Sequence, residues 1–146
     1  MARLVRDHLR VVAAGLAAAL SLVVAPAQGE ITGPGGRCQG LAESASLVAI
    51  NVEKLTVSTT ALSLTASKYA PTSGTFAGAI AVAVLISVDS NGVNATDDGT
   101  TPVAAGPGVA LVSNTYWICR SSIARFQAIR TSGTDSVVNA IFYIAR

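Results

Sequence analysis

Short apolar segments, each closed by turn-forming residues, limit the fold of this chain more than any other feature of its sequence. From position 48 onward, apolar residues alternate with Ser, Thr and other polar residues over short stretches, and Gly, Pro, Asn or Asp follows most of them. These stretches are too short and too rich in Val, Ile and Thr for stable helices, so each is expected to be a strand. The sequence therefore predicts an all-β domain.

Two turn signals separate the expected strands. Asn91-Gly92 suits the positive φ angles of a tight turn. Ser132-Gly133-Thr134-Asp135 lies between two alternating segments and predicts a hairpin that joins 124–129 to 137–144. Phe126 and Phe142 are the expected core anchors of this hairpin.

The remaining segments complete the predicted architecture. The apolar run at 79–88 has a helix as its alternative, but its β-branched residues favour a strand, and the segment 67–78 is turn-like. About six to eight short antiparallel strands predict a small β-sandwich or a jelly-roll-like barrel. The expected strands lie within 55–65, 79–88, 93–96, 109–112, 116–119, 123–129 and 137–144.

The region before this domain has a different character. Residues 1–29 resemble a signal peptide, helical or disordered, with an arginine-rich start, an apolar stretch at 11–24 and small residues at Ala25-Pro26-Ala27. The apolar stretch is too short for a permanent membrane anchor, and cleavage after Ala27 is expected. Residues 30–47 are expected to be a Gly-rich linker, and 48–146 the β-sandwich domain.

A second hypothesis concerns where translation begins. Ordered pattern begins only near Val48, and valine is a residue whose GTG codon can serve as a bacterial start. The hypothesis is that residues 1–47 are a wrongly assigned upstream extension and that Val48 is the true start.

The chain contains two cysteines, Cys38 in the Gly-rich stretch and Cys119 in an expected strand. A disulfide between them is one interpretation. Two independent thiols is the other, and it is preferred because a single pair does not make a disulfide framework. Cys119 is then a small apolar residue of the strand, since no neighbouring base activates it.

The charges argue against nucleic-acid binding. Only 12% of residues are charged, and six basic residues face five acidic ones after position 47. A protein that binds DNA or RNA through phosphates normally needs a clustered cationic face, and no such run occurs. We expect no direct nucleic-acid partner.

The same region lacks the residues for common reaction chemistry. The only histidine is His8, so Ser–His–Asp and Cys–His arrangements are excluded from the domain. Asp97 and Asp98 are neighbours rather than carboxylates opposed across a cleft. The segment 89–92 shares residues with a calcium loop, but no glutamate follows Glu53. We therefore expect no catalytic residue, no cofactor and no metal.

Four residues are candidates for an interface. Tyr116 and Trp117 are adjacent aromatic residues of the kind that anchor interfaces, and their alternative is packing in the core or between the sheets. Arg125 is opposite in phase to Phe126 and is expected to point outward, toward a carboxylate on a neighbouring subunit. Arg130 follows at the next five-residue step.

The order of several motifs resembles that in a known family. The chain contains Asp97-Asp98-Gly99-Thr100-Thr101-Pro102, then 106–111, 123–130 and 135–143. This order is similar to that of small β-rich virion structural proteins of tailed bacteriophages and prophages, with their Asp-Gly-Thr-x-Pro turn, Gly-x-x-Leu strand and phenylalanine-containing hairpin. The likeness covers 48–146; the chain departs from it at 94–96 and around 116–120.

The resemblance implies a capsid decoration, neck or tail component without catalysis, in which Asp98, Gly99, Thr100 and Pro102 form a structural turn. The expected partners are other virion proteins or copies of the chain, in a homo-oligomer located in the virion. The alternative is a secreted or periplasmic β-sandwich that acts as an adhesion or binding module, exported by the N-terminal signal.

Overall fold

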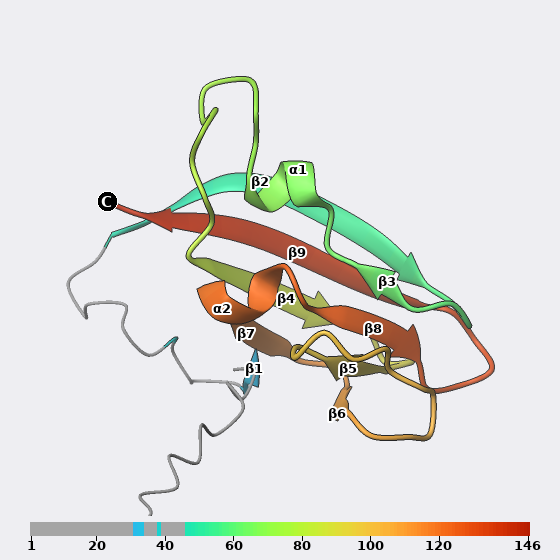
Figure 1. The fold of residues 1–146 in the computed structure, drawn as a ribbon. Coiled ribbons are helices and arrows are strands. Elements are labelled where there is room, and N and C mark those ends of the chain that lie inside the picture. Colours follow the sequence, from blue (N-terminus) through green and yellow to red (C-terminus); the bar gives the residue numbers. More distant parts are fainter. Residues whose placement is uncertain (1–30, 34–37, 39–45) are drawn as a thin grey trace, which may run out of the picture.

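Two antiparallel sheets pack into a sandwich in the computed structural model, which describes residues 31–33, 38 and 46–146 (Figure 1). The five-stranded sheet has the order β1-β7-β4-β9-β2, and the four-stranded sheet has the order β3-β8-β5-β6. The predicted all-β sandwich is confirmed. Its elements are β1 (Ile31–Thr32), β2 (Leu47–Val57), β3 (Leu62–Ser63), α1 (Ala66–Tyr69), β4 (Ala83–Val88), β5 (Val93–Thr96), β6 (Val109–Leu111), β7 (Thr115–Cys119), α2 (Arg120–Ile123), β8 (Gln127–Arg130) and β9 (Ser136–Ala145).

The strand pairing is nested. β2 pairs with β9, β3 with β8, β4 with β7 and β5 with β6, all antiparallel. This arrangement, in which a long hairpin is wrapped around two sheets, is the topology of a jelly roll. β1 extends the five-stranded sheet beyond β7. The chain therefore forms a jelly roll of eight strands with one added edge strand among the described residues.

Alternation along the strands builds the core. Val84 and Ile86 of β4 and Phe142 of β9 point between the sheets and are fully buried. Phe126, just before β8, is buried with them, so both predicted core anchors are confirmed. Because neighbouring strand residues point to opposite faces, this inner set leaves the residues between them on the outer face of the sheet.

The predicted hairpin between 124–129 and 137–144 is wrong. β8 belongs to the four-stranded sheet and β9 to the five-stranded sheet, so the turn at 131–135 crosses from one sheet to the other. The segment 89–92 likewise carries the chain from β4 to β5 in the opposite sheet. Turn-forming residues reverse the chain direction, but they do not decide which sheet receives the next strand.

Two predicted strands also need correction. Within the run 79–88, the strand β4 begins only at Ala83. The N–H of Val82 donates to the carbonyl of Tyr143 where the chain enters the sheet, and the residues before Val82 form a loop. The segment 123–129 begins as the end of α2 and becomes a strand only at Gln127. Here Phe126 donates its N–H to the carbonyl of Ser122, so a helical turn precedes β8.

The segment expected to be a linker contributes to the fold. β1 lies within residues 30–47 and pairs with β7, and Cys38 of the same segment is buried. β2 begins at Leu47. The predicted signal segment at 1–29 lies outside the described residues. A chain that started at Val48 would lack both β1 and Cys38.

Candidate interaction surfaces

An apolar row crosses the outer face of the five-stranded sheet. The strand register aligns Val52 of β2 with Ile141 of β9, Ile141 with Leu85 of β4, and Leu85 with Trp117 of β7. We call Val52, Ile141, Leu85 and Trp117 the outer row. Val52 is 64% exposed and the other three are half-buried. The outer row therefore places a continuous apolar line on a surface that the core does not use.

The rows on either side of the outer row differ in character. On one side, the register aligns Tyr143 with Ala83 and Ala83 with Cys119, and the Tyr143 ring lies 5.6 Å from the Trp117 ring between centroids. On the other side, the register aligns polar residues from four strands, which mark the border of the apolar area. This polar row is Lys54, Asn139, Ser87 and Thr115.

The structure separates the two aromatic candidates. Trp117 belongs to the outer row, whereas Tyr116 points the opposite way and packs against the core. The Tyr116 hydroxyl donates to the carbonyl of Val112 and accepts from the N–H of Val112, both at 3.0 Å. Tyr116 thus satisfies backbone groups beside the edge strand β6 and is not an anchor on the outer face.

Arg125 engages its own chain. Its Nε donates to the carbonyl of Ser121 at 3.1 Å, and its aliphatic stem lies over Gly99. Its charge also acts on Asp97 and Asp98 of the neighbouring loop: it adds slightly to the hydrogen bonds that lower the pKa of Asp98, and it only partly opposes the burial that raises the pKa of Asp97. The carboxylates nearest to Arg125 are therefore intramolecular, and contact with a neighbouring subunit stays a prediction.

Two of the four residues of the predicted structural turn, Asp98 and Gly99, lie beside Arg125. The Asp98 carboxylate accepts from the N–H and the hydroxyl of Thr100, at 2.9 and 2.7 Å, and these bonds hold the pKa of Asp98 below its usual range. Gly99 has a φ of +94°, a conformation that favours glycine. Pro102 is fully buried. The motif is explained by turn geometry.

Asp97 contrasts with its neighbour. Burial raises the pKa of the Asp97 carboxyl, and repulsion from Asp98 adds to the rise, while a hydrogen bond from the Ser122 hydroxyl opposes it. The Oδ2 atom of Asp97 is buried and has no hydrogen-bond partner. Desolvation disfavours the charged form of such a carboxyl.

Asp89 connects three loops at the opposite end of the sandwich. Its carboxylate accepts from the Ser136 hydroxyl at 2.6 Å, from the N–H of Val137 at 2.8 Å and from the N–H of Asn91 at 3.1 Å. Its carbonyl accepts from the N–H of Ser113. The Ser136 bond is the main reason that the pKa of Asp89 lies below its usual range. Sequence reasoning considered Asp89 as a turn residue and as part of a calcium loop, and it missed these contacts because Ser113, Ser136 and Val137 lie far away in the chain.

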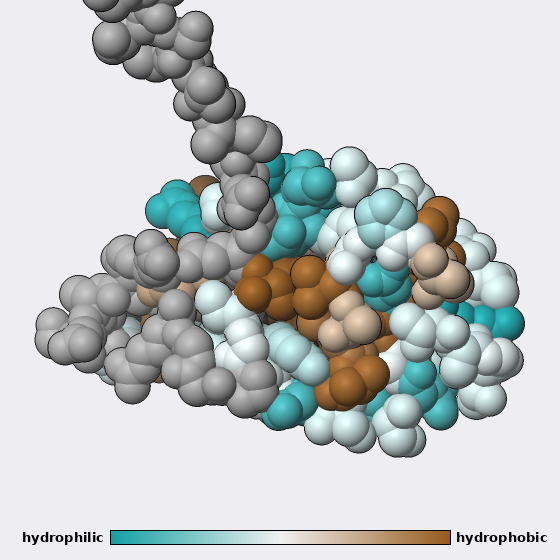
Figure 2. Space-filling model, turned by 90° about the horizontal axis from the view of Figure 1, so that it is seen from below, coloured by the Kyte–Doolittle hydropathy of each residue, from teal (hydrophilic) through white to brown (hydrophobic). Residues whose placement is uncertain are grey.

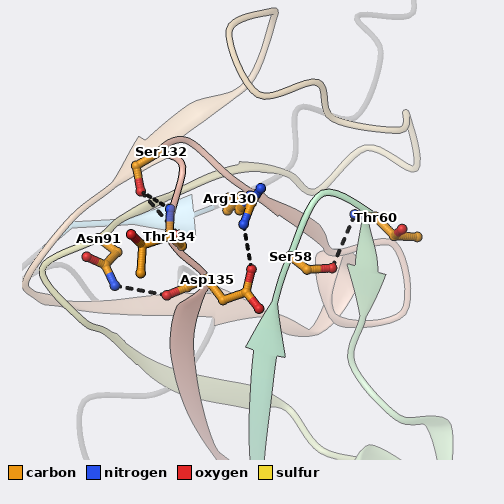
Figure 3. A network of polar contacts seen from close by, with 7 residues as sticks. All are labelled: Ser58, Thr60, Asn91, Arg130, Ser132, Thr134 and Asp135. Atoms are coloured by element: carbon orange, nitrogen blue, oxygen red, sulfur yellow. Dashed lines mark hydrogen bonds and ion pairs between the residues drawn. The ribbon is translucent and has the colours of Figure 1, made fainter.

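Arg130 belongs to the same end of the molecule (Figure 3). Its guanidinium forms an ion pair with Asp135 at 2.7 Å, across the turn between β8 and β9. Asn91 donates its side-chain N–H to the carbonyl of Asp135 at 2.9 Å. Arg130 therefore has an intramolecular partner that stabilises the loop cluster, and its role as an interface residue stays a prediction.

Cys38 and Cys119 form a disulfide. The preferred interpretation of two independent thiols is therefore wrong. The bond connects the segment after β1 to the end of β7, and both residues are buried beside Ala83 and Trp117. The two cysteines lie 81 positions apart in sequence, so the spacing alone gave no sign of their proximity.

A second apolar area lies at the edge of the four-stranded sheet. Val109 and Val112 lie in or beside β6, and Val103 lies in the loop before it; each is about half exposed. Figure 2, seen from the side on which β6 and β1 lie in Figure 1, shows apolar residues gathered in the middle of the face. The loop that carries Val103 is tied down by buried Asn94, which donates to the carbonyl of Val103 at 2.7 Å.

The described residues offer no cluster of three or more His, Cys, Asp or Glu side chains suited to a metal ion. Within this same part of the chain, neither helix has the length and apolar character that a membrane-spanning segment needs. Comparison with protein-family models, with curated proteins and with solved structures gave no match for the chain.

Proposed function

We propose that this protein is a non-enzymatic structural or assembly protein that packs through the outer face of its five-stranded sheet. The observation that carries the proposal is the outer row. Val52, Ile141, Leu85 and Trp117 form it on four adjacent strands, although the sandwich already has a closed core between its sheets. A line of apolar side chains outside the core gains free energy only when another surface covers it.

The composition of this surface suits protein contact. Apolar residues form its centre and a row of uncharged polar residues with one lysine forms its border, which resembles the core and rim of many interfaces. Trp117, with Tyr143 beside it, supplies the large aromatic area that hot spots favour. The proposed partners are copies of the chain or other proteins of the same assembly.

The proposed setting is a virion of the tailed-bacteriophage type, as a capsid decoration, neck or tail component. Two considerations support this setting: the order of motifs in 97–143, and the jelly-roll topology, which viral capsid proteins use among many other proteins. Because one fold serves many functions, the topology alone carries little weight, and the motif order is the stronger support.

A second candidate is a secreted or periplasmic binding module that uses the same face. The disulfide between Cys38 and Cys119 favours it, because disulfides persist mainly in oxidising compartments. It also agrees with the signal-like residues 1–29.

One experiment separates the two candidates. Particles and culture supernatant from the source are fractionated, and the N-terminus and intact mass of the native protein are measured in each fraction. The virion proposal expects the protein in purified particles, and its absence from them would refute that setting. A supernatant form that begins at Gln28 would support the exported module instead.

A second experiment tests the surface itself. Val52→Asp places a charge in the outer row at a side chain that is 64% exposed, so the domain should still fold. Thr56→Asp is the matched control, because Thr56 is exposed on the same face of the same strand. We expect Val52→Asp to lower recovery in the native assembly at least about tenfold, the effect of roughly 1.4 kcal/mol, and Thr56→Asp to leave it near the parent level. Equal recovery of both variants would exclude the outer row as the contact.

A further inference from the structure

Asn91-Gly92 is the only Asn-Gly pair in the chain, and each of the other asparagines is followed by a residue with a side chain. An asparagine loses its amide when the next backbone nitrogen attacks the carbonyl carbon of its side chain. A side chain on the next residue hinders this attack, whereas glycine leaves the nitrogen open and its backbone adaptable. Asn91 is therefore the asparagine of this chain with the greatest chemical tendency to react.

The fold requires glycine at position 92. Gly92 has a φ of +70°, a conformation that favours glycine. A Cβ there would lie 2.9 Å from Cγ1 of Val112 and 3.2 Å from the carbonyl oxygen of Leu111. The packing of the loop between β4 and β5 thus excludes the bulkier residues that would protect Asn91.

The Gly92 nitrogen is held weakly, whereas Asn91 is held by several bonds. The N–H of Gly92 donates to the carbonyl of Asp89 at 3.4 Å, longer than the usual distance of about 2.9–3.0 Å. The N–H of Asn91 donates to the Asp89 carboxylate at 3.1 Å. Its side chain donates to the carbonyl of Asp135 at 2.9 Å (Figure 3), and its carbonyl accepts from the Thr131 hydroxyl at 3.2 Å. These bonds to Asn91 restrain the reactive pair.

We propose that Asn91 is a site of spontaneous deamidation and that its hydrogen bonds to Asp89 and the turn 131–135 set the rate. The reaction takes place when the loop 89–92 opens locally and the Asn91 side chain turns toward the Gly92 nitrogen. Loops open at a lower free energy than core strands, so this step does not need global unfolding. The inference is independent of the proposed function, because it concerns loops and not the outer face of the sheet.

The reaction needs only water. The Gly92 nitrogen gives its proton to solvent and bonds to Cγ of Asn91, while the Cγ–Nδ2 bond breaks and the amide nitrogen leaves as ammonia with a proton from solvent. Water then opens the cyclic imide that results. Addition of water at Cγ leaves aspartate at position 91, and addition at the backbone carbonyl leaves isoaspartate, in which the chain runs through Cγ. No atom is oxidised or reduced.

Deamidation turns one attractive contact into a repulsive one. The amide donor of Asn91 becomes a carboxylate that faces the carbonyl oxygen of Asp135, so the hydrogen bond between them is lost. The new charge also lies near the Asp89 carboxylate, to which the N–H of Asn91 donates. The product therefore loosens the contact between the loops 89–92 and 131–135, and the loss of ammonia makes the change one-way.

Peptide mapping of the unaltered chain tests the site. The folded full-length chain is incubated at mildly alkaline pH, and samples are digested and analysed by mass spectrometry with separation of aspartate from isoaspartate. Asn114 is the internal reference, because it is an exposed loop residue that precedes Thr115. We expect Asn91 to convert at least about tenfold faster than Asn114, since only its successor lacks a Cβ. A sample taken at the start measures conversion during digestion, and conversion of Asn91 no faster than that of Asn114 would overturn the proposal.

Two aspartate variants test the control of the rate. Asp89→Ala removes the acceptor of the Asn91 N–H and should raise the conversion rate of Asn91 at least about fivefold, because the loop opens more often. Asp98→Ala is the matched control, since Asp98 likewise accepts from the N–H two residues ahead, that of Thr100, and it should leave the rate at Asn91 unchanged. An unchanged rate in Asp89→Ala, or equal acceleration in both variants, would overturn local control by these bonds.

Hydrogen exchange tests the effect of the product. Asn91→Asp reproduces the aspartate form, and Asn91→Ala removes the same donor without adding a charge. We expect amides of 131–135 to exchange at least about threefold faster in Asn91→Asp than in the parent chain, with a smaller increase in Asn91→Ala. Exchange at the parent rate in Asn91→Asp would contradict the proposed loosening of the two loops.

Discussion

The two ends of the sandwich are held together in different ways. At one end, which we call the hydrogen-bonded end, the loops 58–61, 89–92, 112–114 and 131–135 meet, and Asp89 binds donors from two of the other loops or their flanking residues. At the other end, which we call the stapled end, α2 directly follows Cys119, which forms the disulfide with Cys38, and Asp97 of the loop 97–108 accepts a hydrogen bond from Ser122 of α2. An aspartate that follows a strand is found at each end, Asp89 after β4 and Asp97 after β5.

These two aspartates show how environment decides the role of a residue type. Asp89 receives several hydrogen bonds, and its pKa is lowered. Asp97 is desolvated, keeps one oxygen without a partner, and its pKa is raised. The ionised carboxylate of Asp89 therefore stabilises the hydrogen-bonded end. At the stapled end the carboxylate of Asp97 is desolvated, and the disulfide holds the chain together instead. This difference leads to predictions that can be ordered by size.

The largest effect is expected from removal of the disulfide. Replacing both Cys38 and Cys119 by Ser opens a loop of 81 residues, for which the chain-entropy model gives a loss of about 4.5 kcal/mol in the free energy of unfolding. Urea unfolding of the full-length chain measures it. Hydrogen exchange should show lost protection in β1 and β7 and retained protection around Asp89. Equal loss at both ends would contradict the separation of the two ends.

A smaller effect is expected at the hydrogen-bonded end. Asp89→Ala removes the acceptor of Ser136, Val137 and Asn91 and should lower the free energy of unfolding by about 1–2 kcal/mol, since solvent partly replaces the lost bonds. The same urea titration measures it. Asp97→Asn is the comparison variant at the stapled end, and it should be neutral or slightly stabilising, because it removes a desolvated charge. The comparison fails if Asp97→Asn destabilises the protein more than Asp89→Ala.

The smallest effect is expected in the response to acid. The stabilising contribution of Asp89 is fully present above its unfolded pKa of 3.8 and is lost as the pH falls through its lower folded pKa. Asp97 acts in the opposite direction, because its folded pKa lies above 3.8. Its desolvated charge lowers the stability of the fold at neutral pH, and protonation removes this cost as the pH falls through the folded pKa. Unfolding measured from pH 7 to pH 3 should therefore show a steeper acid loss in Asp97→Asn than in the parent chain. A shallower loss in that variant would reverse the assigned signs.

The sequence was a good guide to strands and a poor guide to their partners. The local pattern located β5 at 93–96 and the core anchor Phe142 of β9 correctly, because the period of the side chains is a local property. The pairing was missed, since β2 bonds to β9 and β4 bonds to β7 across long stretches of chain. Among the described strands of this nested topology, β5 and β6 are the only two that follow each other in the chain and are also hydrogen-bonded to each other. Turn signals elsewhere therefore suggested hairpins that the fold does not contain.

The candidate surface was predicted in part. Trp117 was named from its residue type, and it lies in the outer row. Val52, Leu85 and Ile141 were not found, because each lies in an ordinary alternating or apolar segment and only the register brings them into line. Of two adjacent aromatics in a strand, only one can face outward, and the sequence did not show that Tyr116 would face inward.

Hydroxyl-radical footprinting tests the central claim, that the outer row is covered when the protein is in its native assembly. The isolated chain and the assembly recovered from the source are oxidised under equal doses, and the modification of individual residues is measured by mass spectrometry. We expect Trp117 and Val52 to be oxidised at least several-fold less in the assembly, while exposed Thr56 on the same face changes little. Equal oxidation of Trp117 and Val52 in both samples would show that the outer row stays open, and the proposed function would be contradicted.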